Sequence, residues 1–314
     1  MSGTANAFLQ GVTRLESKTS GDLPSWVNSL RRSAFEWVGV HGFPTDKDVA
    51  WKYTRVAPIL AIPFASAEPG VRRALSPSDV TALAGELGGP RLVFVNGYFV
   101  PELSALKSLP EGVRLGSLAS VFAEEGEVLE SLLWRRLRER PQAFMALNVA
   151  LGEDGAFIRI PAHINVEEPI HLVFISDTGA TPLVSHPLSV VFAGAGSRAT
   201  IVETHVGIAG GIYLSNAVTE LVLDEGAVVD HYKVQNEAES AFHFRVHGRA
   251  PGTRKPVLGA LGRPRRRARP ARGEGLARRP RGAGRAERPV PAARAADPRQ
   301  PNDDRARRPP LHQP

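Results

Sequence analysis

Apolar positions recur at helical spacing from the start of the chain to about residue 140. The first such stretch repeats every three or four positions: Trp26, Leu30, Ala34, Trp37 and Val38. This spacing is typical of an amphipathic helix. A second helix is expected to start at an N-cap, Ser78, and to stop at Gly88-Gly89-Pro90, and a third runs from about Glu127 to Arg138. We therefore predict a mainly helical N-terminal domain over residues 1–140.

A short hairpin interrupts this helical part. Leu92–Val95 and Tyr98–Val100 are apolar runs on either side of Asn96-Gly97. Both residue types tolerate a positive φ, which a two-residue hairpin turn requires.

From Ala143 the spacing of apolar residues changes to about two, and we expect strands too close together for helices between them. The predicted strands are Ala156–Ile160, Ile170–Ser176, Leu188–Phe192, Ala199–Thr204, Ala217–Leu223, Val228–Val234 and Phe242–Val246. Three of them follow a similar Gly-containing corner, at Gly155, Gly196 and Gly226. Such recurrence suits a β-solenoid, in which each coil stacks on the last, although a β-sandwich would give the same density of strands.

Composition separates the C-terminal segment from the rest of the chain. Residues 251–314 contain 17 Arg and one Lys against five acidic residues, a net charge of +13, whereas residues 1–250 carry −6. They also hold 12 of the 26 Pro and no aromatic residue. Such a segment cannot bury enough apolar surface to offset the entropy of ordering, so we predict a disordered Arg/Pro-rich tail over 251–314.

The same inventory excludes several classes of site. The chain has no Cys, so it cannot itself hold an iron–sulfur cluster or a zinc site with sulfur ligands. It has no apolar run long enough to span a membrane and no secretory signal pattern, and we expect a cytoplasmic protein. Neither a nucleotide-binding Gly-x4-Gly-Lys loop nor a Gly-x-Ser-x-Gly elbow is present.

Four polar residues of the predicted strands are candidates for metal ligation. Glu203, His205, His231 and His243 could converge on stacked coils as oxygen and nitrogen ligands. Asp230 with Tyr232, and His243 with Arg245, alternate in the same way. The alternative is that all are exposed or hydrogen-bonded strand side chains. We favour that alternative, and assign no catalytic, cofactor-binding or metal-binding residue.

Two further features are interpreted as structural. Gly194-Ala195-Gly196 sits where a strand turns, and a corner is favoured over a phosphate cradle. Trp51-Lys52-Tyr53-Thr54 could stack on a ligand, but such aromatic clusters more often anchor a loop to its own domain.

The order of several motifs between positions 30 and 250 resembles the SufB/SufD family of the SUF iron–sulfur cluster assembly machinery, and its SufD branch in particular. The motifs are GFPT at 42–45, WKYT at 51–54, LVFVNGYFVP at 92–101, IP at 160–161, PIHL at 169–172, HP at 186–187, TIVE at 200–203, HYKVQNE at 231–237 and AFH at 241–243. Val49-Ala50 departs from the acidic pair often found there.

This resemblance implies an α+β protein with a helical N-terminal domain and a central right-handed parallel β-helix, here at 141–250, which favours the solenoid over the sandwich. It implies a non-catalytic scaffold subunit that pairs with a SufB-like subunit and a SufC-like ATPase. The iron–sulfur cluster is then the product of the assembled complex, and the partner ATPase binds the ATP.

The family's C-terminal third, with the helices that dock the ATPase, has no counterpart here, and a shifted reading frame would explain this. Read one nucleotide out of register, 286–292 can encode Leu-Asn-Gly-Leu-Tyr-Leu, and 300–314 can encode a stretch containing Thr-Thr-Ile-Glu-His. Both segments resemble the family, in the right order. We therefore expect the chain from about position 255 onward to be out of frame and the protein as written to be impaired.

Two other functions remain open. A nucleic-acid-associated protein could use the Arg-rich tail as an electrostatic arm on a β-rich body. A cupin-like enzyme could bind a metal or a sugar through Glu203 and His205.

Overall fold

A computed structural model of the chain describes residues 23–68, 74–106, 109–122, 124–139, 142–208 and 210–251. All of them lie in the first of two compact units, Met1–Arg279. The predicted disordered tail and its shifted reading frame fall outside the described residues, apart from Pro251.

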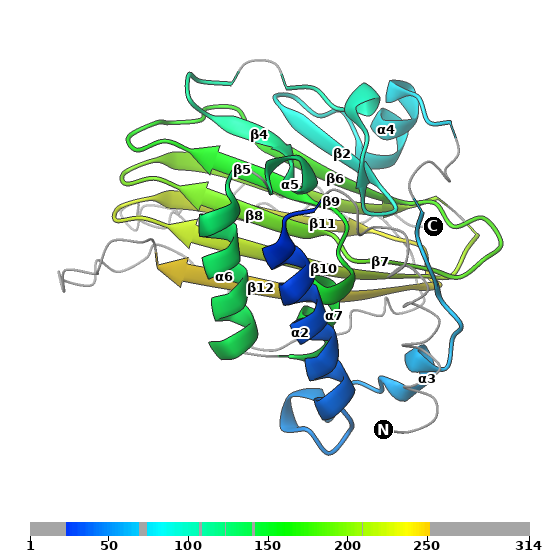
Figure 1. Ribbon diagram of the computed structural model, residues 1–314. Coiled ribbons are helices and arrows are strands. Elements are labelled where there is room, and N and C mark those ends of the chain that lie inside the picture. The colour runs from blue at the N-terminus through cyan, green and yellow to red at the C-terminus, as the bar shows by residue number, and fades with distance from the viewer. Residues whose placement is uncertain are drawn as a thin grey trace, which may run out of the picture. The chain divides into compact units, whose positions relative to one another are not determined.

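Two sheets form the centre of this unit (Figure 1). The larger sheet contains β1 (Ala65–Ser66), β4 (Arg114–Ser117), β5 (Ala156–Ile160), β7 (Leu183–Ser185), β8 (Leu188–Ala193), β10 (Tyr213–Leu223) and β12 (Ala241–Pro251). The smaller sheet contains β2 (Arg91–Val95), β3 (Tyr98–Phe99), β6 (Ile170–Ser176), β9 (Arg198–Gly207) and β11 (Val228–Asn236). Among these strands, only the pairs β2–β3 and β4–β5 are antiparallel.

From β5 onward the chain alternates between the two sheets, except that β7 and β8 both join the larger one. The later strands of each sheet pair in parallel at a regular offset along the chain. In the larger sheet Val191 pairs with Leu221, and in the smaller sheet Thr204 pairs with Val234. The architecture is thus a mixed α and β fold built on two mostly parallel sheets.

The corners after β5, β8 and β10 stack in a column. The amide of His163 donates to the carbonyl of Ala195 at 2.8 Å, and the amide of Gly196 donates to the carbonyl of Glu225 at 2.9 Å. His163, Gly196 and Gly226 all have positive φ, at 63°, 65° and 70°. The recurrence of Gly at two of these corners therefore reflects a repeated left-handed turn.

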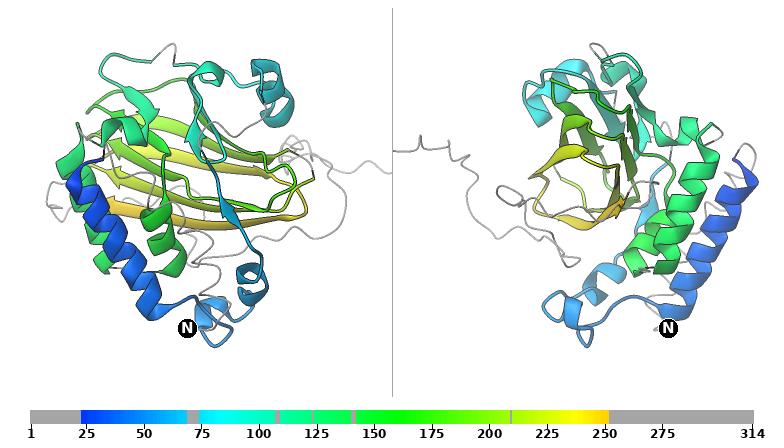
Figure 2. Two further views of the ribbon diagram at one scale, coloured as in Figure 1. Left: turned by 45° about the vertical axis from the view of Figure 1, so that its right-hand side comes forward. Right: turned by 90° about the vertical axis from the view of Figure 1, so that its left-hand side faces the viewer.

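Helices cover the outer faces of both sheets. The larger sheet packs through one apolar cluster against α2 (Ser25–His41), α6 (Gly126–Glu139) and α7 (Ala143–Leu151) (Figure 2). The smaller sheet packs against α4 (Pro77–Ala84) and the 3₁₀ helix η3 (Pro101–Leu103). Short helices η2 (Val49–Trp51), α3 (Ala57–Leu60) and α5 (Leu118–Val121) connect these elements. A third cluster, with Ile158, Ile201 and Leu221, fills the space between the sheets.

The structure confirms the strand predictions. All seven segments are strands; β5 and β6 have the predicted bounds, and the others extend further. The hairpin is also confirmed, since β2 and β3 are joined by Asn96 and Gly97 with φ of 52° and 89°.

The prediction that strand-like spacing of apolar residues begins at Ala143 is wrong. The segment Ala143–Leu151 is the helix α7, and every residue from Ala143 to Ala150 is buried. A helix buried on all sides shows no polar face, so its apolar residues have no helical period to detect. Strands β1 to β4, all from residues 65–117, also join the two sheets rather than staying with the helices.

The start of α4 differs from the predicted N-cap. The cap is Ser76, and its hydroxyl accepts from the amide of Asp79, whose carboxylate accepts from the amide of Ser76. Pro77 occupies the first turn, where its missing N–H costs nothing. The helix ends at Ala84, because Gly85 takes a φ of 86°.

Replacing Ser76 by alanine should destabilise the protein by about 1 kcal/mol, because it removes the reciprocal cap. Ser78→Ala is the matched control, since within the described structure the Ser78 hydroxyl forms a hydrogen bond only with the Ser76 hydroxyl. Urea denaturation of both variants tests this. Equal losses for both would show that the capping box contributes nothing specific.

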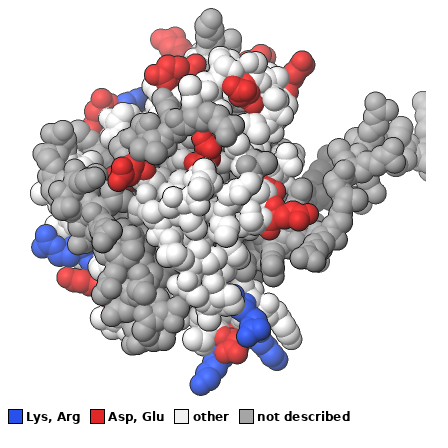
Figure 3. Space-filling model, turned by 90° about the vertical axis from the view of Figure 1, so that its right-hand side faces the viewer, with Lys and Arg blue, Asp and Glu red and all other residues white. Residues whose placement is uncertain are grey.

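The surface charge of the described part agrees with the negative charge of residues 1–250. On the face in Figure 3, acidic side chains surround a broad area without charged side chains, and basic side chains gather at the bottom. Among the described residues, no helix has both the length and the apolar character needed to cross a membrane.

A buried ionic cluster between the sheets

The interior between the sheets changes from apolar to polar along β9. Its inward-facing residues are first Ala199 and Ile201, both buried in the apolar cluster, and then Glu203 and His205. On β11 every second side chain, from His231 onward, is shielded while its neighbours are exposed. The register places Glu203 beside Lys233 and His205 beside Gln235. The larger sheet contributes Thr219 from β10 and His243 from β12.

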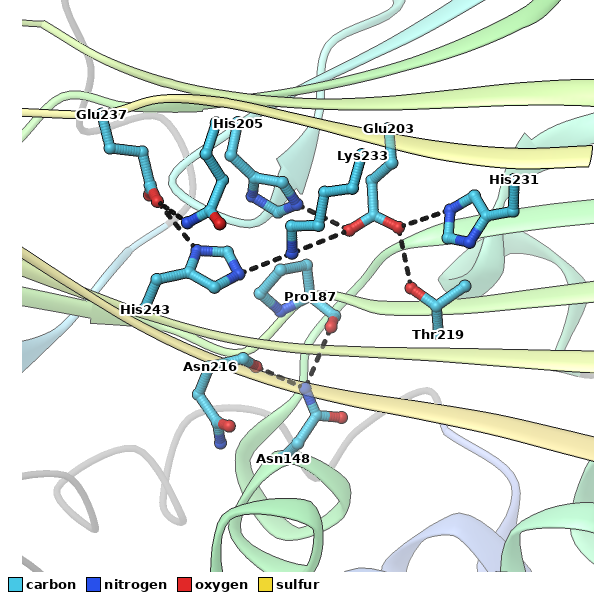
Figure 4. A network of polar contacts seen from close by, with 11 residues as sticks. Asn148, Pro187, Glu203, His205, Asn216, Thr219, His231, Lys233, Glu237 and His243 are labelled. Carbon is cyan, nitrogen blue, oxygen red and sulfur yellow. Dashed lines mark hydrogen bonds and ion pairs between the residues drawn. The ribbon is translucent and has the colours of Figure 1, made fainter. Parts of the chain in front are cut away.

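Glu203 is the centre of one half of this cluster (Figure 4). Its Oε1 is 2.6 Å from Nε2 of His205 and 3.4 Å from Nζ of Lys233. Its Oε2 accepts from the hydroxyl of Thr219 at 2.9 Å and lies 3.0 Å from Nε2 of His231. The side chain is only 1% exposed. Four partners therefore compensate the burial of one carboxylate, as a buried charge requires.

Lys233 links Glu203 to the second half. Its Nζ is 2.6 Å from Nε2 of His243, and Nδ1 of His243 is 3.0 Å from Oε2 of Glu237. Gln235 donates to the same Glu237 oxygen at 2.8 Å. A continuous line of polar contacts thus runs from Glu203 through Lys233 and His243 to Glu237, in the connection between β11 and β12 (Figure 4).

Burial and the contacts between the side chains together set the pKa values in the cluster. Burial by itself would raise the pKa of Glu203, but the Lys233 ammonium and the hydrogen bonds from His205 and His231 hold it well below its usual range. Burial lowers the pKa of His205 to about 3 and also lowers those of His243 and Lys233. Glu203 is therefore ionised, and His205 and His243 are neutral near pH 7.

The four candidate ligands of the sequence do converge, as hydrogen-bonded strand side chains. Glu203 contacts His205 and His231 directly, and the ring of His243 meets that of His205 edge-on at 4.6 Å between centroids. Asp230 and Tyr232 are on the outward face of β11, where Tyr232 is 58% exposed.

Four members of the cluster were missed from sequence. Lys233, Gln235 and Glu237 continue the alternation that starts at His231, so that signal was available along one segment. Thr219 gave no such signal, because β10 and β9 belong to different sheets and only the packing of the two sheets places them opposite each other.

A separate pair of buried amides fixes α7 to β10. The side-chain amide of Asn148 donates to the carbonyls of Pro187 at 3.0 Å and Asn216 at 2.7 Å (Figure 4). Asn216 donates to the carbonyl of Phe144 at 2.7 Å. These bonds hold a fully buried helix on the sheet, which is a structural role.

The other two singled-out motifs are explained by packing. Trp51 is 4% exposed and its ring contacts those of Phe144 and Phe244, so it anchors its loop as predicted, whereas Tyr53 is 91% exposed. A Cβ on Gly194 would lie 2.6 Å from the amide nitrogen of Ala162, which supports the structural corner.

Comparison with known proteins identifies the family. The model described as "SufBD protein N-terminal region" matches residues 8–172, more than half of the chain. The chain belongs to the SufBD family. The model described as "SUF system FeS cluster assembly, SufBD core domain" matches residues 174–251, where the described part also ends. The predicted resemblance is thereby confirmed, and the buried cluster lies wholly within the SufBD core domain.

Individual SufBD relatives are similar at low identity. The "Iron-sulfur cluster assembly SufBD family protein slr0076" of Synechocystis sp. is 29% identical over 76% of this chain and 53% of its own length. The "Iron-sulfur cluster assembly protein SufD" of Escherichia coli is 25% identical over 65% of this chain and 45% of its own length. The SufD protein of Bacillus subtilis is 24% identical over 76% of this chain and 55% of its own length. This chain spans about half the length of these curated relatives.

Proposed function

We propose that this protein is a SufD-like, non-catalytic scaffold subunit of the SUF iron–sulfur cluster assembly complex, in the cytoplasm. The observation that carries the proposal is the family match, which runs in order from residue 8 to residue 251. Two of the similar proteins are named SufD.

The two sheets are proposed to be the walls of a right-handed parallel β-helix. Its support is the regular offset between paired strands and the column of stacked corners at His163, Gly196 and Gly226. Each coil would then consist of one strand from each sheet.

As partners we propose a SufB-like subunit and a SufC-like ATPase, with the iron–sulfur cluster as the product and ATP bound by the ATPase. Among the described strands, β11 and β12 each pair on one side only. The outward face of β11 also exposes Val228, Tyr232 and Val234, by 41%, 58% and 47%. Such strands are suited to further pairing or docking.

The shifted reading frame beyond about position 255 also remains a proposal. Its support is the re-reading of two tail segments as family-like sequence. The nucleotide sequence of codons 245–270, with mass spectrometry of tail peptides, tests it. One uninterrupted frame that encodes the Arg-rich peptides would rule it out.

Co-expression tests the scaffold function. The tagged chain, both as written and with its frame repaired, is expressed with the SufB-like and SufC-like proteins of its own organism. We expect the repaired chain to retain both partners on the affinity column and the chain as written to retain little of either. A repaired chain that purifies alone would contradict the proposal.

The composition of the tail favours one rival, a nucleic-acid-associated protein. It predicts DNA binding that weakens steeply with salt and disappears when residues 255–314 are deleted. DNA binding unchanged by that deletion would count against it.

A further inference from the structure

We propose that His205, Glu237 and His243 form a binding site for one divalent first-row transition metal ion of the Fe²⁺ or Zn²⁺ type. Each residue offers one ligand atom, and these atoms lie within 4.8 Å of one another. The site goes beyond the proposed scaffold function and does not depend on it. It also differs from the cupin-like hypothesis, because Glu203 is not one of its ligands.

Two of the three residues carry buried atoms that lack a hydrogen-bond partner. Oε1 of Glu237 and Nδ1 of His243 are both inaccessible, and neither makes a hydrogen bond within the described structure. Nδ1 of His243 has only the 3.0 Å contact with Oε2 of Glu237. Buried polar atoms are usually satisfied, so a buried carboxylate oxygen without a hydrogen bond, on the side chain whose other oxygen contacts Nδ1 of His243, indicates a missing partner. A cation would satisfy this oxygen and Nδ1 of His243 at once.

The donor set selects the class of metal. Two imidazoles and one carboxylate suit Fe²⁺, Co²⁺, Ni²⁺ and Zn²⁺, whereas Mg²⁺ and Ca²⁺ prefer oxygen ligands only. Adjacent ligands around an ion with bonds of about 2.1 Å lie roughly 3.4 Å apart. The three atoms, which lie within 4.8 Å of one another, would therefore have to approach by at most about 1.4 Å. Three protein ligands leave coordination positions for water or an exchanging ligand.

The surroundings of His205 match the usual second layer of such a site. Its Nε2 is 2.6 Å from Oε1 of the ionised Glu203, so the neutral ring donates from Nε2 and keeps the lone pair of Nδ1 for a ligand bond. Metal-bound histidines are commonly held in this way by a carboxylate. The ring of Phe174 stacks on His205 at 4.8 Å between centroids and fixes its plane.

Lys233 is the internal competitor of the metal. Its Nζ lies 2.6 Å from Nε2 of His243 and places a positive charge beside the proposed ion. Because the ion would bind Nδ1 of His243, this contact on Nε2 can remain, and the ammonium, which also lies 3.4 Å from Oε1 of Glu203, opposes the ion through its charge. Removal of the lysine should therefore strengthen metal binding. Glu237, the least buried of the three ligands, marks the side from which an ion enters.

Cobalt titration of the purified full-length chain tests the site. Co²⁺ is added while visible absorption is recorded, and calorimetry gives the stoichiometry. We expect saturable binding of one ion per chain, weakened at least tenfold in His243→Ala and in Glu237→Gln. His41→Ala and Glu239→Gln, at exposed positions, are the matched controls and should bind like the wild type.

The decisive variant is Lys233→Met, for which we expect affinity to rise at least tenfold. An unfolded variant could mimic a loss of binding but not this gain, and circular dichroism checks the fold of each protein. Absence of saturable binding in both the wild type and Lys233→Met would overturn the proposal, as would binding that His243→Ala leaves unchanged. No partner subunit is needed, so failure here is distinct from failure of the scaffold function.

Discussion

Replacement of Glu203 by glutamine should lower the free energy of unfolding by about 3–5 kcal/mol. The substitution leaves the Lys233 ammonium buried without its counter-charge. It also places an amide NH₂ where the carboxylate met only donors, from His205, Thr219 and His231. Urea denaturation followed by circular dichroism measures the loss.

Two further variants isolate the cause. Glu239→Gln makes the same chemical change at an exposed position and should shift the free energy of unfolding by no more than about 0.5 kcal/mol. The double variant Glu203→Gln/Lys233→Met removes both charges and should recover at least half of the loss. If the single variant is as stable as the wild type, the cluster does not hold the sheets together.

Replacement of Gly155 by alanine should cost about 3 kcal/mol or more. A Cβ on Gly155 would overlap the backbone carbonyl of Leu188, where β5 and β8 begin to pair. The preceding Asp154 fixes this corner, since its Oδ1 accepts from Ser117 and from the amides of Ala119 and Gly155. The amide of Leu188 also donates to the carbonyl of Asp154 at 3.1 Å, so the two backbones cannot separate without breaking bonds.

Gly116→Ala is the matched control, because nothing lies within 4 Å of a Cβ at that strand position. It should be neutral to within about 0.5 kcal/mol, helped by the smaller entropy of the unfolded chain. Equal stability of the two variants would mean that β5 and β8 can separate at Gly155 without cost.

The candidate site was half predictable from sequence. His231, Lys233 and Glu237 alternate along a single segment, and the spacing of two puts alternate side chains on one face. Which other side chains contact these residues depends on how strands pair within each sheet and on how the two sheets pack against each other. His243 was a candidate from the sequence, but Thr219 comes from a strand that no local pattern links to Glu203.

By itself the sequence determined the strands and their corners. Alternation of apolar and polar positions is a local property, and a Gly between two such runs marks a turn in any fold. The sequence also determined the family, because the order of motifs along a chain can be read without knowing which residues contact each other.

Only the tertiary structure decided the rest. The helix α7 is buried on every side, so packing rather than periodicity made it helical. The ionic cluster exists because parallel pairing places β11 beside β9 in one sheet and β12 beside β10 in the other, and the two sheets face each other. A contact between strands of different sheets, such as that of Thr219 with Glu203, has no local signal.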